Sequence, residues 1–139
     1  MQLNFDKAGG LLPAVIQESG TGKVLMVGYM NDKALEETLR TGYATFYSRS
    51  RNRLWVKGES SGHRLKIHDV LVDCDEDTLL IVAQQFGPGT CHEGYRTCFF
   101  RRVEGDRLVE VEPRVFDPKT VYGPSSGSQA TRNGQEGSK

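Results

Sequence analysis

The three cysteines of this chain stand close together in the sequence, among acidic residues. Cys74 lies within the run Asp-Cys-Asp-Glu-Asp at residues 73–77, and Cys91 and Cys98 enclose a segment that begins Cys91-His92. A closed structural zinc site normally has four protein ligands, whereas a catalytic zinc keeps one position for water. Three thiols without an obvious fourth ligand therefore favour a metal centre that carries out hydrolysis.

The carboxylates around Cys74 predict a second metal site. If a strand continues through residues 70–75, Asp73 and Asp75 share one face, about 7 Å apart, and Cys74 points to the other face. The carboxylate oxygens of Asp73, Asp75 and Asp77 suit Mg²⁺, whereas the Cys74 thiolate suits Zn²⁺. The alternative is a solvated acidic turn after a strand.

The three histidines differ in what their positions suggest. His92 follows a candidate ligand, so it could act as a general acid or base near neutral pH, or close the metal site as a fourth ligand. His68 lies on an alternating strand, where a structural role and a functional role are equally open. His63 follows a glycine in a loop, which suits either a substrate contact or a simple exposed position.

Hydrophobic periodicity predicts the elements that must position these residues. Strands at residues 14–17 and 23–30 are joined by a glycine turn, and a helix follows between Asn31 as N-cap and Gly42 as C-terminal stop. Further strands are expected at residues 44–48, 53–57, 65–73, 78–84, 97–103 and 108–111. The pattern indicates an α+β fold with a largely antiparallel sheet and few short helices.

Length and composition limit the function classes. The 139 residues suit one domain at residues 1–122, followed by a Gly/Ser-rich segment at 123–139 that is expected to be disordered. Eighteen basic and eighteen acidic residues cancel, so no overall field favours nucleic acid or an anionic membrane. Neither a signal peptide nor a membrane-spanning apolar stretch is evident, which predicts a cytoplasmic protein with reduced cysteines.

Three ordered motifs resemble those of phosphoribosyl-AMP cyclohydrolase, an enzyme family of histidine biosynthesis. They are LWVKGESSG at residues 54–62, DCDED at 73–77 and CHEGYRTCF at 91–99. The resemblance extends from about residue 24 to residue 101 and corresponds to the monofunctional form. It implies a zinc-dependent hydrolase that opens the adenine ring of 1-(5-phosphoribosyl)-AMP at the N1–C6 bond, the third step of L-histidine biosynthesis. Ser60 departs mildly from the threonine of many relatives but keeps the hydroxyl group.

The resemblance also implies cofactors, a partner and ligands. It implies one zinc ion per subunit, shared across the interface of an intertwined homodimer and bound by Cys74, Cys91 and Cys98. It implies magnesium on Asp73, Asp75 and Asp77. The catalytic candidates are His92 and Glu59, because either side chain could carry the proton that ring opening requires.

Two phosphate groups of such a substrate would have to be held. Positive charge, hydroxyl and backbone N–H donors, and one aromatic ring define the substrate-binding candidates. These candidates are Arg49, Arg51, Trp55, Lys57, Ser60, Ser61 and Gly62. By themselves, Arg49 and Arg51 are also consistent with a solvated turn, and a lone Trp in a strand is more often packed in a core or an interface.

Two other function classes remain open on the sequence. A small zinc-stabilised binding module would close its metal site with His92 and hydrolyse nothing, and it would unfold when the metal is lost. A nucleic-acid binder would use Arg49, Arg51, Arg53 and Trp55. The balanced net charge and the shortness of that basic run argue against nucleic acid as a partner.

Overall fold

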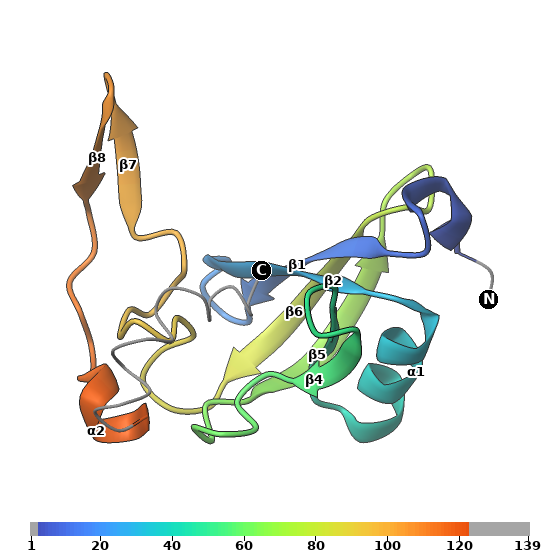
Figure 1. The fold of residues 1–139 in the computed structure, drawn as a ribbon, viewed down its shortest axis with the longest axis horizontal. Helices are drawn as coiled ribbons and strands as arrows, with labels where there is room; N and C mark the ends of the chain where they lie inside the picture. The colour runs from blue at the N-terminus through green and yellow to red at the C-terminus, as the bar shows by residue number, and fades with distance from the viewer. Residues whose placement is uncertain (1–2, 123–139) are drawn as a thin grey trace.

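The computed structural model describes residues 3–122, so the segment 123–139 that was expected to be disordered lies outside the described residues. Strands dominate, with two short α-helices and one 3-10 helix (Figure 1). The elements are η1 Phe5–Ala8, β1 Leu12–Glu18, β2 Val24–Met30, α1 Asp32–Thr41, β3 Thr45–Ser48, β4 Arg53–Val56, β5 Leu65–Val72, β6 Leu79–Gln85, β7 Arg101–Glu104, β8 Arg107–Glu110 and α2 Pro118–Tyr122. The α+β class is confirmed.

A four-stranded sheet in the order β2-β1-β6-β5 forms the centre of the molecule. Strand β1 pairs antiparallel with β2, and β5 pairs antiparallel with β6. Strands β1 and β6 pair in parallel, with Ala14 opposite Leu79 and Glu18 opposite Ala83. The sequence predicted the antiparallel pairs, which adjoin along the chain, but not the parallel pair, whose strands are separated by residues 19–78, about half of the domain.

The core lies on one face of this sheet. Alternate residues of the two central strands are fully buried there: Leu12, Ala14 and Ile16 of β1 and Leu79, Ile81 and Ala83 of β6. Ala34 and Leu35 of α1 and Phe46 of β3 belong to the same buried cluster. Helix α1 and the β3–β4 hairpin therefore cover the same face of the sheet.

Helix α1 has the ends that its sequence predicts. The Asn31 side chain accepts a hydrogen bond from the Ala34 N–H at 2.8 Å, which caps the N-terminus. Gly42 ends the helix in the left-handed region at φ 84°, with its N–H donated to the Thr38 carbonyl. No helix within residues 3–122 is long and apolar enough to cross a lipid bilayer.

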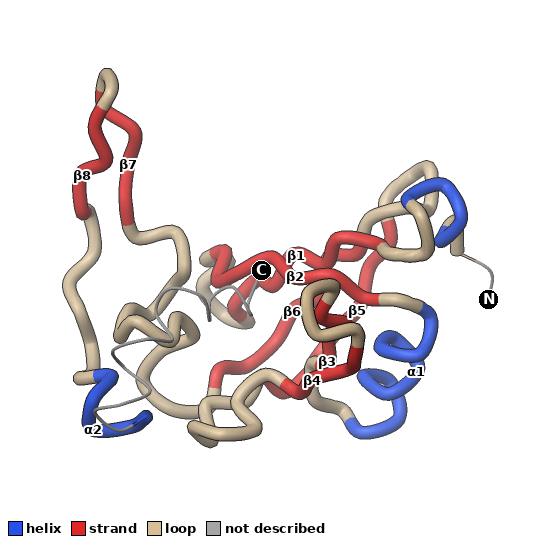
Figure 2. The backbone as a smooth tube through the Cα atoms, viewed as in Figure 1, coloured by secondary structure: helices blue, strands red, loops and turns tan. Residues whose placement is uncertain are grey.

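Two predicted strands are confirmed with shorter bounds than expected. Strand β5 ends at Val72, so residues 73–75 do not continue it, and β7 begins only at Arg101 rather than at residue 97. Thr97 and Cys98 leave the strand pattern because they hydrogen-bond to β2 instead. Long loop segments between β6 and β7 are visible in Figure 2, and the β7–β8 hairpin extends away from the central sheet.

Candidate metal centre and substrate-binding residues

The acidic turn between β5 and β6 gathers three carboxylates. One oxygen each from Asp73, Asp75 and Asp77 lies within 4.8 Å of the others. Asp73 Oδ1 accepts the N–H groups of Asp77 at 3.1 Å and Thr78 at 3.2 Å, which folds the chain back on itself. The expected strand alternation is therefore wrong, but the turn brings the same carboxylates together. Such a group could hold a hard divalent cation.

Cys74 is exposed on this turn, and β6 lies between it and the other two cysteines in the chain. It precedes β6, whereas Cys91 and Cys98 follow it. The seven residues of β6 span about 20 Å at 3.3 Å per residue. Among residues 3–122, the metal-sized group of three or more ligands is the aspartate group, and the three thiols do not form one. One chain thus holds two thiols together and the third at the opposite end of a strand.

A loop brings Cys91 and Cys98 together. The Cys91 N–H donates to the Tyr95 carbonyl at 3.0 Å, and the Gly94 N–H donates to the Cys91 carbonyl at 3.0 Å. Cys91 is buried and Cys98 half-buried. A hydrogen bond with Cys98, reinforced by burial, raises the pKa of the Cys91 thiol. The seven-residue spacing therefore marks the two ends of a looped segment, and two helical turns are excluded.

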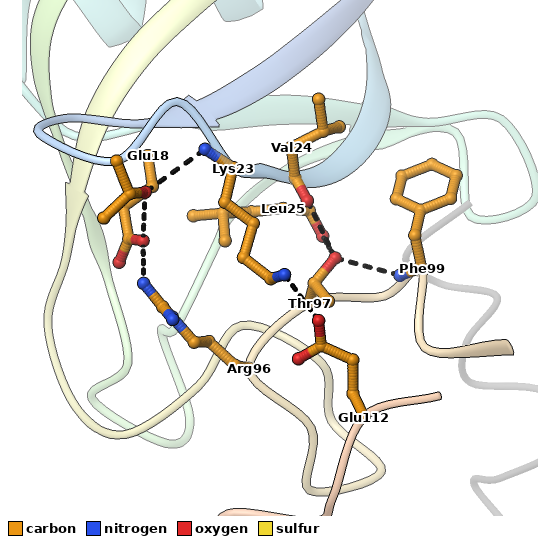
Figure 3. Close-up of polar contacts among 9 residues, drawn as sticks. Glu18, Lys23, Val24, Leu25, Arg96, Thr97, Phe99 and Glu112 are labelled. Carbon is orange, nitrogen blue, oxygen red and sulfur yellow. Dashed lines mark hydrogen bonds and ion pairs between the residues drawn. The ribbon is translucent and has the colours of Figure 1, made fainter. Parts of the chain in front are cut away.

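Backbone and hydroxyl hydrogen bonds fix the end of this loop to β2 (Figure 3). The Cys98 N–H donates to the Leu25 carbonyl at 2.8 Å. The buried Thr97 hydroxyl donates to the Val24 carbonyl at 2.8 Å and accepts the Phe99 N–H at 3.0 Å. Cys98 and its neighbour Thr97 are thereby both bonded to the start of β2.

Two ion pairs flank the same junction (Figure 3). The Arg96 guanidinium pairs with the Glu18 carboxylate at the end of β1. Lys23 Nζ lies 2.5 Å from Glu112 Oε2, which joins the β1–β2 turn to the segment after β8. Sequence reasoning gave these residues no role, because each pair joins positions more than seventy residues apart.

His63 is buried, with 9% of its surface exposed, which excludes the simple exposed position. Its ring packs edge-on against Phe116 with centroids 4.9 Å apart. A Cβ at Gly87 would lie 2.4 Å from the His63 ring, so the segment leading to Cys91 passes directly against it. Burial and, second, the charge of Lys57 lower the pKa of His63.

The other two histidines lie in different surroundings. His92 directly follows Cys91 and is half-buried, so it stays next to a candidate metal ligand. His68 is exposed on β5, with its Nδ1 3.5 Å from the Ser19 hydroxyl.

The substrate-binding candidates occupy two ends of the β3–β4 hairpin. Arg49 and Arg51 lie in the exposed turn that joins the strands, and the Arg49 guanidinium stands 4.4 Å from the centre of the Tyr29 ring. At the other end, the loop after β4 contains Lys57, Ser60, Ser61 and Gly62. Lys57 is buried with 6% of its surface exposed, so it is no ordinary surface lysine. The four residues of β4 separate the two ends by about 10 Å.

A cavity of about 480 Å³ lies between α1 and the β3–β4 hairpin. Its lining residues are Lys33, Glu36, Glu37, Thr45, Leu54, Trp55, Val56 and Glu59. Trp55 also packs against Phe46, with ring centroids 5.1 Å apart, so it contributes to the core as well as to the cavity. Glu59 accepts the Val56 N–H at 3.2 Å and lies 3.7 Å from the Arg53 guanidinium. The fold thus brings Trp55 and Glu59 together, whereas His92 does not line this cavity.

Comparison with known proteins identifies a single family. The sequence model of the family described as phosphoribosyl-AMP cyclohydrolase matches residues 26–100. A phosphoribosyl-AMP cyclohydrolase of Solibacter usitatus is 52% identical over 126 residues, which cover 91% of this chain and 100% of the relative. The protein of that name from Desulfotalea psychrophila is 54% identical over 88% of this chain and 98% of its own length. The Geobacter metallireducens relative, with the same name, is 48% identical over 88% of this chain and 98% of its own length.

Proposed function

The chain belongs to the phosphoribosyl-AMP cyclohydrolase family, and we propose that it opens the adenine ring of 1-(5-phosphoribosyl)-AMP by hydrolysis of the N1–C6 bond. It is a hydrolase of histidine biosynthesis, and the product would be the phosphoribosyl-formimino-aminoimidazole carboxamide ribonucleotide. The observation that carries the proposal is 52% identity to a relative of that name over that relative's whole length.

The thiols fit a zinc ion, which we propose as one cofactor. Thiolate sulfur is a preferred ligand of Zn²⁺, and Cys91 and Cys98 already lie within hydrogen-bonding distance of each other. We infer that Cys74 cannot join them within one chain, because β6, which is about 20 Å long, lies between it and the other two thiols. The third thiol would therefore come from a second copy, which supports a homodimer with one zinc ion per subunit.

The chain's own residues would manage the protons of the reaction. Zinc bound by the thiols would supply hydroxide near neutral pH, because it lowers the pKa of bound water. The nitrogen that leaves C6 needs a proton, and His92, next to Cys91, is the first candidate to deliver it. Glu59 is the second candidate, since its carboxylate shares a cavity with Trp55.

We propose magnesium as a second cofactor, held by Asp73, Asp75 and Asp77. Three carboxylates within 4.8 Å repel one another, and a divalent cation would relieve that repulsion. The cation would neutralise charge on the phosphorylated substrate.

The two groups of substrate-binding candidates suit a substrate with two phosphates. Arg49 and Arg51 would bind one phosphate at the β3–β4 turn, and the loop of Lys57, Ser60, Ser61 and Gly62 would bind the other. Their separation of about 10 Å along β4 means that a single phosphate cannot contact both groups. Trp55, beside this loop, could stack on the purine.

The first experiment measures turnover of phosphoribosyl-AMP by the ultraviolet absorbance of the ring-opened product. Activity should disappear when a chelator removes zinc and return when zinc is restored. His92→Ala should lower kcat on the order of 100-fold while zinc stays bound, and His68→Ala should leave turnover unchanged. A folded, zinc-loaded protein without turnover would contradict the proposal. Release of zinc and unfolding in His92→Ala would instead indicate the closed site of a binding module.

The second experiment tests the shared site by mixing two inactive variants. Cys74→Ser and Cys91→Ser chains are denatured together and refolded in equal amounts. If the thiols come from two copies, half of the dimers are mixed and each has one intact site, so activity returns to about a quarter of wild type. If all three thiols act within one chain, the mixture stays as inactive as its components.

A further inference from the structure

The segment between β8 and α2 lies against the loop that holds two of the thiols. We call residues 111–116 the clasp and residues 91–98 the cysteine loop. The Val115 N–H at 2.7 Å and the Phe116 N–H at 3.2 Å both donate to the Gly94 carbonyl. A Cβ at Gly94 would lie 2.4 Å from the Phe116 carbonyl oxygen, so the two backbones are in direct contact. The clasp therefore fixes the turn in the middle of the cysteine loop.

Further contacts hold the clasp along its length. The Val111 N–H donates to the Phe100 carbonyl at 2.8 Å. Arg114 pairs with Tyr95 in an isolated antiparallel bridge, and its guanidinium lies 5.2 Å from the centre of the Tyr95 ring. The family model, which matches residues 26–100, ends before the clasp, so the motifs of the family do not account for these contacts.

The side chain at the end of the clasp reaches the loop after β4. Phe116 packs edge-on against His63, with ring centroids 4.9 Å apart. The His63 N–H donates to the Ser61 hydroxyl at 3.1 Å. A Cβ at Gly58 would lie 2.5 Å from the His63 carbonyl oxygen. His63 is thus packed directly against residues 57–62, which we call the phosphate loop.

The buried His63 ring is enclosed by the chain that leads into the cysteine loop. Gly87 passes so close that a Cβ there would lie 2.4 Å from the ring. The ring also hydrogen-bonds with the Gly89 backbone, whereas its Nδ1 has no hydrogen-bond partner within residues 3–122. Close-packed interiors have low compressibility and transmit displacement. A shift of the phosphate loop would therefore press the ring against Phe116 and against this incoming chain.

We propose that His63 and Phe116 are positioning residues that couple the phosphate loop to the cysteine loop, so that zinc binding by the thiols orders the phosphate loop. Coupling between two binding sites is reciprocal, so a phosphate on the loop would in turn hold the thiols in place. The substrate would thereby bind more tightly to copies that carry zinc. The proposal rests on the proposed function, because that function assigns zinc to the thiols and a phosphate to the loop.

The test measures backbone hydrogen exchange by NMR in the full chain, with zinc bound and after a chelator has removed it. The Gly62 N–H donates to the Gly58 carbonyl at 2.8 Å and the Arg64 N–H to the Gly62 carbonyl at 2.9 Å, so both amides report opening of the phosphate loop. Zinc should slow their exchange about tenfold. The Arg51 N–H, which donates to the Ser48 hydroxyl in the β3–β4 turn, is the internal control and should change little.

Two variants remove the link between the loops. Phe116→Leu keeps an apolar side chain at a half-buried position but removes the ring, and at saturating zinc it should abolish the slowing at Gly62. His63→Leu should have the same effect, because it removes the other ring of the pair. Phe5→Leu is the matched control. It makes the same change at a half-buried position of η1, which lies at the opposite end of the molecule from the clasp (Figure 1), and it should keep the full slowing.

The outcomes separate the coupling from the reaction. Exchange that zinc does not slow in the wild-type chain, that it slows equally at Arg51, or that it still slows in both Phe116→Leu and His63→Leu would overturn the coupling. If one of these variants fails to fold, as checked by circular dichroism, the other decides. An active wild-type chain without the slowing would contradict the coupling alone. A wild-type chain that shows the slowing but no turnover of phosphoribosyl-AMP would support the coupling and contradict the proposed function.

Discussion

The two ends of β6 hold their candidate metal ligands in opposite ways. At the start, the acidic turn is exposed, and it is ordered by hydrogen bonds that the Asp73 carboxylate accepts from the N–H groups four and five positions later. Beyond the other end, Cys91 is buried, and Thr97 and Cys98 are bonded to β2, more than seventy residues away in sequence. The first end is therefore a local structure, and the second depends on the fold as a whole. Mutations should disturb the second end more strongly than the first.

The largest effect is expected from Gly89→Ala, in the cysteine loop. A Cβ at this position would lie 2.5 Å from the Tyr95 carbonyl oxygen, which is backbone and cannot move aside easily. The free energy of unfolding should fall by about 2 to 3 kcal/mol, and zinc retention should fall with it. Urea denaturation at a fixed protein concentration measures the change.

Gly105→Ala, in the β7–β8 turn, is the control for this substitution. Its Cβ would meet open space, and the cost of its φ of +64° alone is about 1 kcal/mol. Equal losses for the two variants would show that the cysteine loop is no more constrained than an exposed turn.

Thr97→Val should have the next largest effect. Valine keeps the volume but removes the hydroxyl, so the Val24 carbonyl loses its donor and the Phe99 N–H loses its acceptor. The expected loss is about 1 to 3 kcal/mol in the free energy of unfolding. Competition with a chelator should show weaker zinc binding, because Cys98 is the next residue. Thr97→Ser should keep most of the wild-type zinc affinity, and a serine variant as weak as the valine variant would assign the effect to packing of the methyl group.

At the acidic turn, Asp73→Ala should cost only about 1 kcal/mol in the free energy of unfolding, through loss of one capping oxygen. Asp73→Asn keeps an oxygen acceptor and should restore that stability. The proposed magnesium site predicts that Mg²⁺ raises the melting temperature of the wild-type chain and that both variants lose this rise. A rise that persists in Asp73→Asn would show that this carboxylate is not a magnesium ligand.

The smallest effect concerns pH and the buried His63 beside the cysteine loop. Burial and then Lys57 lower its pKa below the ordinary value of 6.5, so the unfolded chain binds a proton more readily than the folded chain. The contribution of neutral His63 is therefore complete above pH 6.5 and declines as the pH falls below it. As the pH is lowered from about 7.5 to 5, the free energy of unfolding should fall less steeply in His63→Gln than in wild type. A parallel pH dependence in the two proteins would contradict this.

Elements with local signals could be predicted from the sequence. Asn31 and Gly42 gave both ends of α1, and the alternating strands around the glycine turn gave the β1–β2 hairpin. The strand predicted at residues 97–103 is confirmed only over residues 101–103, because Cys98 bonds to Leu25, a partner that no neighbouring residue indicates. The short helix α2 was not predicted at all, and its five residues carry too little periodicity to signal a helix.

The sequence by itself determined which side chains could do the chemistry and which family the three motifs resemble. The types and order of residues 54–62, 73–77 and 91–99 were sufficient for that. The type of a side chain already fixes which of its atoms can bind a metal ion or transfer a proton. Tertiary structure alone decided that His63 is buried and that β6 separates Cys74 from the other thiols. These outcomes depend on contacts between distant segments, such as the parallel pairing of β1 with β6, and local residue patterns do not encode such contacts.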